Sequence, residues 1–148
     1  MITKQELEIA LRNAMKSGDE VRKRTIRMVL ASIKLVEVEK GTTLSEPELA
    51  AILQKEIKIR KEAIQDAEKG NRPDLVEANQ AEIKVLEEFL PKQLTEDELI
   101  AMAKAVINQV GASSLADVGK VMKVLLPQIK GQAPNELVSK IVRQLLNG

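Results

Sequence analysis

Apolar residues recur along most of the chain at intervals of three and four, the spacing of one face of an α-helix. The clearest run lies between residues 99 and 110, where every position of this template is apolar: Leu99, Met102, Ala103, Val106, Ile107 and Val110. No segment shows the apolar-polar alternation of a strand bounded by turn signals. The sequence therefore predicts an all-α protein.

Capping and turn residues divide this pattern into seven helices. Ser45, Pro47 and Glu48 form the start of a capping box, while Gly18 and Asp19 supply a helix stop and a new N-cap. The predicted helices cover about residues 4–17, 19–40, 46–69, 74–90, 96–110, 114–126 and 135–146.

The pattern is interrupted at Pro91, and Thr95 caps the next helix. We therefore predict two domains. The first is a four-helix, bundle-like domain over residues 1–92, and the second is a small three-helix domain over residues 95–148.

The 148 residues include neither His nor Cys. A general base would need a carboxylate or lysine with a strongly shifted pKa, and a metal would need oxygen ligands alone. We therefore predict no catalytic residue, no metal site and no cofactor, and the composition argues against an enzyme that acts alone.

The polar opening from Met1 to Glu8 has no signal-peptide core, and no apolar run approaches the roughly 20 residues that span a bilayer. The lack of Cys fits a reducing compartment. We therefore expect a cytoplasmic protein that has no membrane partner.

Basic residues are concentrated in the last third of the chain. Residues 1–99 contain 17 basic and 20 acidic residues, whereas residues 100–148 contain 6 basic and 2 acidic residues. This asymmetry predicts an anionic partner for the C-terminal part. Because Phe89 is the only aromatic residue, RNA would have to be bound through phosphates and shape rather than by base stacking.

Three lysines form the main candidate site, because the segment between Asp117 and Glu136 contains no acid to pair with them. Two glycines beside them would let a backbone or ligand approach closely, although tight packing in a small domain is an equal explanation. The candidate RNA-binding residues are Lys120, Lys123, Lys130, Gly119 and Gly131.

Ser113 and Ser114 lie near Lys120 in the sequence, so they could be interpreted as nucleophiles in the manner of a serine-lysine amidase. Ser114 and Asp117 are better explained as a capping pair at a helix start. Gly119-Lys120 also lacks the spacing of a phosphate-binding loop.

A second basic patch lies in the second predicted helix and comprises Arg22, Lys23, Arg24 and Arg27. The alternative interpretation of this patch is a solvated helix face whose charge is partly offset by Asp19 and Glu20. In the third predicted helix, Arg60 and its neighbouring lysines alternate with glutamates, which is typical of an exposed, salt-bridged face.

The chain resembles the YqeY family, and the resemblance runs almost end to end. It rests on Arg27-Met28-Val29 with Ala31 and Ile33, Arg60-Lys61-Glu62-Ala63, Phe89-Leu90-Pro91-Lys92-Gln93-Leu94, Gly111-Ala112-Ser113-Ser114, Asp117, Gly119-Lys120-Val121-Met122-Lys123, Lys130-Gly131, Ala133 and Leu137-Val138. Two departures are Gln132, where many members have a basic residue, and Pro134-Asn135, which replaces Asp-Gly.

The family is similar in fold to the tail of the GatB subunit of the tRNA-dependent amidotransferase, which contacts tRNA while the chemistry occurs elsewhere. The resemblance therefore implies an accessory module that binds tRNA or structured RNA. Two alternatives stay open. The chain would assist glutamine-dependent carbon-nitrogen ligation with an amidotransferase or other translation partner that supplies catalysis, or it would be a protein-protein adaptor.

Overall fold

Seven α-helices and one short 3₁₀ helix form the regular structure of residues 3–147, the part of the chain that the computed structural model describes. These residues contain no strand, so the prediction of an all-α protein is confirmed. The elements are α1 Lys4–Ser17, α2 Glu20–Lys40, α3 Glu46–Lys69, α4 Pro73–Glu87, α5 Glu96–Val110, η1 Leu115–Asp117, α6 Val118–Ile129 and α7 Asn135–Asn147.

The predicted caps at the starts of α2 and α3 are confirmed. The Asp19 side chain accepts a hydrogen bond from the backbone N–H of Arg22 at 3.1 Å. At α3 the Ser45 hydroxyl accepts from the Glu48 N–H, while the Glu48 carboxylate accepts from the Ser45 N–H at 3.2 Å. These bonds satisfy donors that the first helical turn would otherwise leave without a partner.

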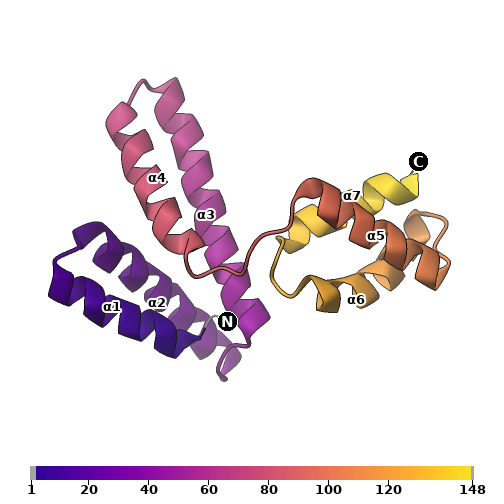
Figure 1. Ribbon diagram of the computed structural model, residues 1–148, viewed down its shortest axis with the longest axis horizontal. Coiled ribbons are helices and arrows are strands. Elements are labelled where there is room, and N and C mark those ends of the chain that lie inside the picture. The colour runs from indigo at the N-terminus through magenta and orange to yellow at the C-terminus, as the bar shows by residue number, and fades with distance from the viewer. Residues whose placement is uncertain (1–2, 148) are drawn as a thin grey trace. The chain divides into compact units, whose positions relative to one another are not determined.

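Packing divides the chain into two units, Met1–Pro91 and Lys92–Gly148, called unit 1 and unit 2 below. In unit 1, α1 and α2 form one helical hairpin, and α3 and α4 form a longer one (Figure 1). Helix α2 contacts both α3 and α4. The core includes Leu7, Ile26, Val29, Ile33, Leu49, Leu53, Ile57, Ile83 and Leu86.

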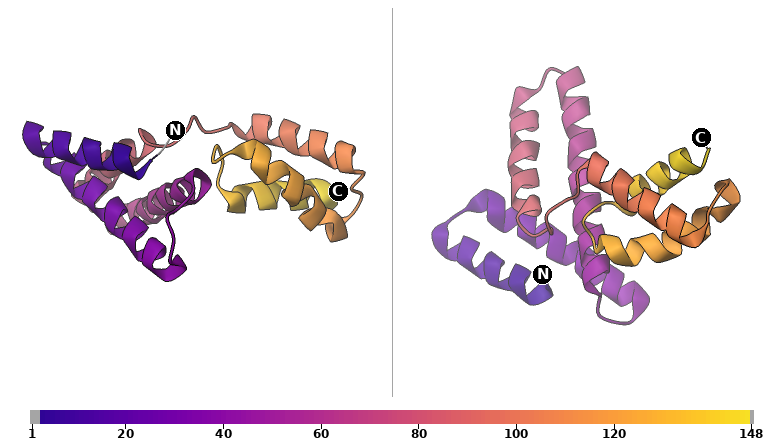
Figure 2. Two further views of the ribbon diagram at one scale, coloured as in Figure 1. Left: turned by 90° about the horizontal axis from the view of Figure 1, so that it is seen from below. Right: turned by 45° about the vertical axis from the view of Figure 1, so that its right-hand side comes forward.

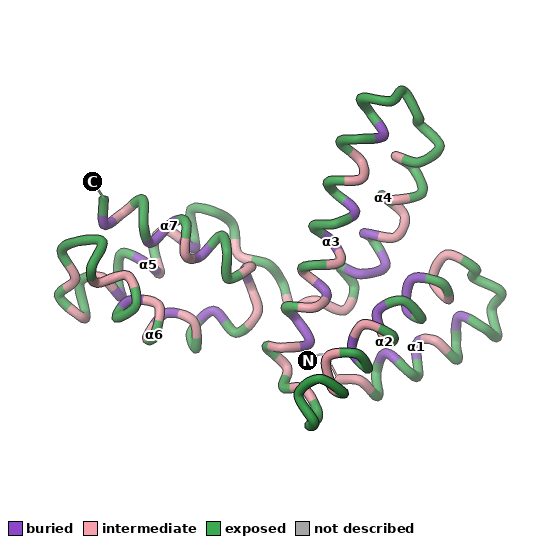
Figure 3. Tube along the Cα trace, turned by 180° about the vertical axis from the view of Figure 1, so that it is seen from behind, coloured by how far each residue is buried: buried purple, intermediate pink, exposed green. Residues whose placement is uncertain are grey.

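Unit 2 consists of α5, α6 and α7, which all contact one another (Figure 2). Buried positions follow the inner faces of its helices (Figure 3), and its core includes Leu99, Val106, Val121, Leu125, Ile129, Val138, Ile141 and Val142. The segment before α5 belongs to this unit, because the backbone N–H of Leu94 donates to the Gln132 carbonyl at 2.8 Å.

Helix α6 continues past Pro127, where the sequence predicted that it would end. A proline in a helix lacks the N–H that would bond to the carbonyl four residues earlier, here that of Lys123. Because Pro127 lies in the last turn, only this bond is lost. The helix ends at Ile129, and Lys130 adopts the left-handed conformation as its C-cap.

The interpretation of Arg60 as part of an exposed face was wrong, since the residue is only 4% exposed. Its Nη1 donates to Glu56 Oε2 at 2.7 Å, and its Nη2 lies 3.7 Å from Glu82 Oε1 on α4. Arg60 follows the buried residues Leu53 and Ile57 by seven and three positions, so it shares their face of α3. The alternating charges of the sequence did not reveal that Arg60 is buried.

Candidate nucleic-acid interface

The three candidate lysines lie along the outer side of α6 and at its end. Lys120 and Lys123 are three residues apart and therefore neighbours on one face, and Lys130 caps the helix ten residues after Lys120. All three are exposed. The opposite face of α6 is buried in the core of unit 2 through Val121, Leu125 and Ile129. Core packing thus determines which way the lysine face points.

These lysines have little local negative charge beside them. The ion pairs found within residues 3–147 involve none of Lys120, Lys123 and Lys130. Lys120 does act on one acid, because its charge helps to lower the pKa of the Asp117 carboxyl. The amines are therefore available to an external anion.

Asp117 closes the loop that precedes α6. Its Oδ2 accepts hydrogen bonds from the backbone N–H groups of Ser113 and Ser114 at 2.9 and 3.3 Å. These two bonds, followed by the charge of Lys120, hold the pKa of Asp117 below its usual value. The arrangement supports the capping interpretation of this segment rather than a nucleophilic serine.

Gly119 lies in the first turn of α6 and is exposed. A Cβ placed there would meet no neighbouring group within 4 Å among the described residues. Tight internal packing, one of the two explanations left open by the sequence, therefore does not account for a glycine at this position. Glycine in a helix costs roughly 0.5–1 kcal/mol relative to alanine, so an external group that approaches the backbone would explain it better.

Gly131 has a different role, because its φ of 77° lies in the left-handed region. Lys130 beside it also has a positive φ of 50°. The turn is tied to the start of unit 2, since Gln93 Nε2 donates to the Gly131 carbonyl at 3.1 Å. Gly131 therefore helps to hold the turn in which Lys130 lies.

Two further cations on unit 2 were not singled out from the sequence. Lys140 and Arg143 lie three residues apart on the exposed side of α7. Their spacing of three residues on the polar side of an amphipathic helix could have identified them from the sequence. Lys140 and Arg143 add to the positive charge of unit 2.

The second basic patch is largely neutralised within unit 1. Arg27 is the exception, because its Nη2 lies 4.0 Å from the Met15 sulfur rather than beside a carboxylate. Phe89 also lies beneath the Arg22 guanidinium, 5.5 Å from the ring centroid. The ion pairs are Arg22 with Glu88, Lys23 with Glu20 at 3.1 Å, and Arg24 with Glu82 at 3.9 Å.

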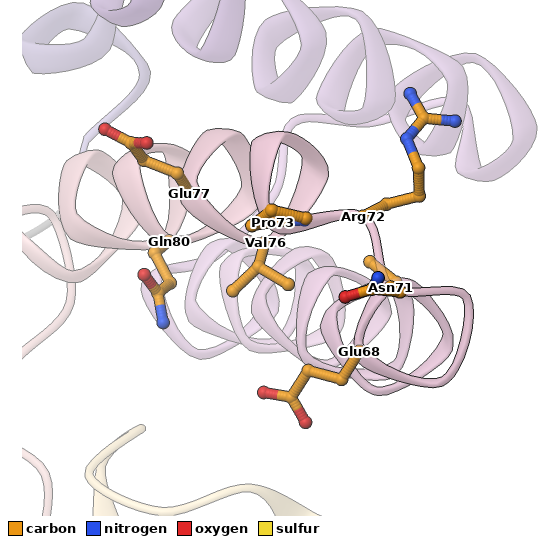
Figure 4. A pocket seen from close by; sticks show the side chains of 8 residues that line it. Glu68, Asn71, Arg72, Pro73, Val76, Glu77 and Gln80 are labelled. Atoms are coloured by element: carbon orange, nitrogen blue, oxygen red, sulfur yellow. The ribbon is translucent and has the colours of Figure 1, made fainter.

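An open pocket of about 520 Å³ lies at the turn between α3 and α4 (Figure 4). Its polar lining includes Glu68, Glu77 and Gln80, but neither a hydroxyl nor an amine that would serve as a nucleophile. Arg72 extends away from Glu68 and is bound to Asp74 at 3.0 and 3.1 Å.

Residues 3–147 contain no group of three or more acidic side chains arranged to hold a metal ion. No single helix in that range is long and apolar enough to cross a membrane, although the bent pair Glu96–Val110 and Leu115–Ile129 meets the criterion by length and composition.

The family model described as Yqey-like protein matches residues 4–146, nearly the whole chain. The chain belongs to the YqeY family. Membership accounts for the motifs in both units, since the match extends across them.

Curated relatives of this YqeY protein carry the name "Altered inheritance of mitochondria protein 41, mitochondrial". The protein from Lachancea thermotolerans is 40% identical over 81 residues, which cover 54% of this chain and 43% of the relative. That from Pyrenophora tritici-repentis is 29% identical over 143 residues, or 95% of this chain and 78% of the relative. The match to the first relative thus covers less than half of its length.

The prediction of a cytoplasmic protein is contradicted by these relatives, which are named as mitochondrial proteins. The polar opening from Met1 to Glu8 lacks only the apolar core of a secretory signal. Mitochondrial targeting segments are amphipathic and rich in Arg and Ser instead. A lack of Cys does not separate the two compartments, so the reasoning had no power to distinguish them.

Proposed function

We propose that this YqeY protein is an accessory module that binds tRNA or structured RNA through the lysine face of α6. The amines of Lys120, Lys123 and Lys130 contact backbone phosphates. The helix presents them outward because its opposite face is held in the core of unit 2. This function needs no catalytic group in the chain.

The observation that carries the proposal is the combination of these exposed lysines with the open backbone at Gly119. Lys120 directly after it and Lys123 one turn later supply positive charge. A phosphate or sugar approaching the first turn of α6 would meet no Cβ at Gly119, so its oxygen atoms could come close to the helix backbone.

Recognition would follow shape and backbone rather than base identity. Phe89, the only aromatic residue of the chain, lies beneath Arg22 in unit 1, so unit 2 has no ring on which bases could stack. Phosphate contacts position a protein on its nucleic acid without reading sequence. We therefore expect several structured RNAs to bind with similar affinity.

The resemblance to the amidotransferase tail supports tRNA as the first RNA to test. Bulk tRNA is titrated into the full chain at about 50 and about 200 mM salt, with fluorescence anisotropy as the measurement. Three phosphate contacts give a slope of log affinity against log salt of about −2 to −3, so affinity falls roughly 15- to 60-fold over this range.

The variant Lys120→Ala, Lys123→Ala, Lys130→Ala should lose most of the affinity at the lower salt and most of the salt dependence. A matched control removes three exposed lysines of unit 1 by Lys16→Ala, Lys61→Ala and Lys69→Ala, with the same change in net charge. Absence of binding at the lower salt, or equal losses in both triple variants, would contradict the proposed site.

A further inference from the structure

An apolar stripe runs along the outer side of α2 in unit 1, on the face that does not enter the core. It consists of Met28, Ala31, Leu35 and Val38, spaced at i, i+3, i+7 and i+10, and is called the α2 stripe below. Leu35 and Val38 are 67% and 72% exposed, and Met28 is 45% exposed. Scattered exposed apolar residues are ordinary, but four in one line on one helix are a contiguous surface.

The neighbouring helix α3 contacts α2 beside this stripe. Ser32 and Glu56 are joined by a hydrogen bond of 3.3 Å across the α2–α3 contact, and Arg60 Nη2 lies 3.7 Å from the Met28 sulfur. Helix α3 thus borders the Met28 end of the stripe through polar contacts.

Cations flank the stripe on its other side. Arg27 and Lys34 are exposed and seven residues apart, which places them on the same flank of α2. The ion pairs found among residues 3–147 include neither of them. Two positive charges that take part in none of these ion pairs therefore lie beside an exposed apolar line.

We propose that the α2 stripe is a docking site for an amphipathic helix of a partner protein whose apolar face is bordered by acidic residues. Apolar residues of the partner at helical spacing cover Leu35 and Val38. Carboxylates about seven residues apart on one flank pair with Arg27 and Lys34. This is the helix-on-helix mode in which apolar contacts supply affinity and flanking charges choose the partner and its orientation.

A second copy of the chain does not fit this charge pattern. In a two-fold antiparallel pair of α2 helices the same flanks meet, so the flank that carries Arg27 and Lys34 would lie against the same two cations of the other copy. Like charges in such positions are destabilising. A lipid surface fits less well too, because helices that lie on membranes use aromatic anchors, and this face has none.

The site is independent of the proposed RNA function, since it lies in unit 1 and uses none of the lysines of α6. The test therefore uses protein without RNA. The probe is a labelled synthetic helix of about 18 residues, long enough to form in isolation, with leucines along one face and glutamates on both flanks. A second peptide carries lysines in place of the glutamates.

The full chain should bind the acidic peptide and bind the basic peptide at least tenfold more weakly. Leu35→Ser with Val38→Ser should weaken binding of the acidic peptide about tenfold or more. The control, Ile9→Ser with Leu75→Ser, removes two other exposed apolar residues and should leave binding unchanged. Arg27→Ala with Lys34→Ala should reduce the preference between the peptides.

Three results would overturn the proposal. The first is no binding of the acidic peptide, or equal losses in the stripe and control variants. The second is association with anionic lipid vesicles that the stripe variant abolishes, which would assign the surface to a membrane. The third is a dimer in sedimentation velocity that the stripe variant dissociates, which would make a second copy the occupant.

Discussion

In unit 1, Arg22 and Arg24 of α2 lie beside Glu88 and Glu82, whereas in unit 2 no carboxylate forms an ion pair with the lysine face of α6 within the described residues. The acids of unit 1 come from more than fifty positions further along the chain and reach α2 through packing. Unit 2 has few acids to bring. A cluster of basic residues thus becomes a candidate anion site only where the fold leaves it without partners.

Arg60 is a buried cation of unit 1, and its removal should have the largest effect on the free energy of unfolding. Arg60→Ala would leave Glu56, whose side chain is 15% exposed, without its cation, and would leave Glu82, 13% exposed, with only the more distant Arg24. We expect the free energy of unfolding to fall by about 3 kcal/mol, because a charge that is left buried and unpaired is costly. Urea denaturation followed by circular dichroism measures this.

The exposed neighbour provides the control. Lys61→Ala should change the free energy of unfolding by no more than about 0.5 kcal/mol, as is usual for surface substitutions. Similar losses in the two variants would show that the Arg60 pairs contribute little to the stability of unit 1.

Two glycines of unit 2 should respond in opposite directions. Gly131→Ala forces a Cβ into the left-handed region and should destabilise the chain by about 1–2 kcal/mol. Gly119→Ala meets no neighbour and should stabilise α6 by about 0.5 kcal/mol. Thermal unfolding of both variants measures the pair.

The Gly119 variant also sharpens the difference between packing and binding. If a phosphate approaches the backbone of α6 as proposed, Gly119→Ala should weaken tRNA binding while it raises thermal stability. Unchanged affinity in the stabilised variant would place the RNA contact on the lysine side chains alone.

Acid should produce the smallest effect, and it concerns an exposed pair in unit 1. The hydrogen bond from Lys40, followed by bonds from the Ser45 N–H and hydroxyl, lowers the pKa of Glu48 from 4.5 to about 2. Because the folded-state pKa is depressed, this stabilisation is present above about 4.5 and is lost as the pH falls towards 2.

Glu48→Gln isolates the charge, since glutamine can still take part in a capping box. The melting temperature of the wild type should exceed that of Glu48→Gln at pH 6, and the difference should shrink as the pH falls from about 4.5 towards 2. A difference that stays constant with pH would mean that ionisation of Glu48 contributes nothing to stability.

The sequence by itself determined the features whose causes lie within a few residues. The caps at Asp19 and Ser45 were predictable because each bond joins groups three positions apart. The all-α class followed from the apolar spacing, and the lysine cluster followed from the lack of acids between Asp117 and Glu136. The motifs identified the family.

Only the tertiary structure decided which charges were buried, paired or exposed. Arg60 looked like its charged neighbours in the sequence, yet packing against α4 buried it. Gly119 and Gly131 were equivalent candidates until one proved to be open and the other held in a left-handed turn. The physical reason is that burial and ion pairing depend on neighbours brought by other helices, whereas capping and periodicity depend on neighbours along the chain.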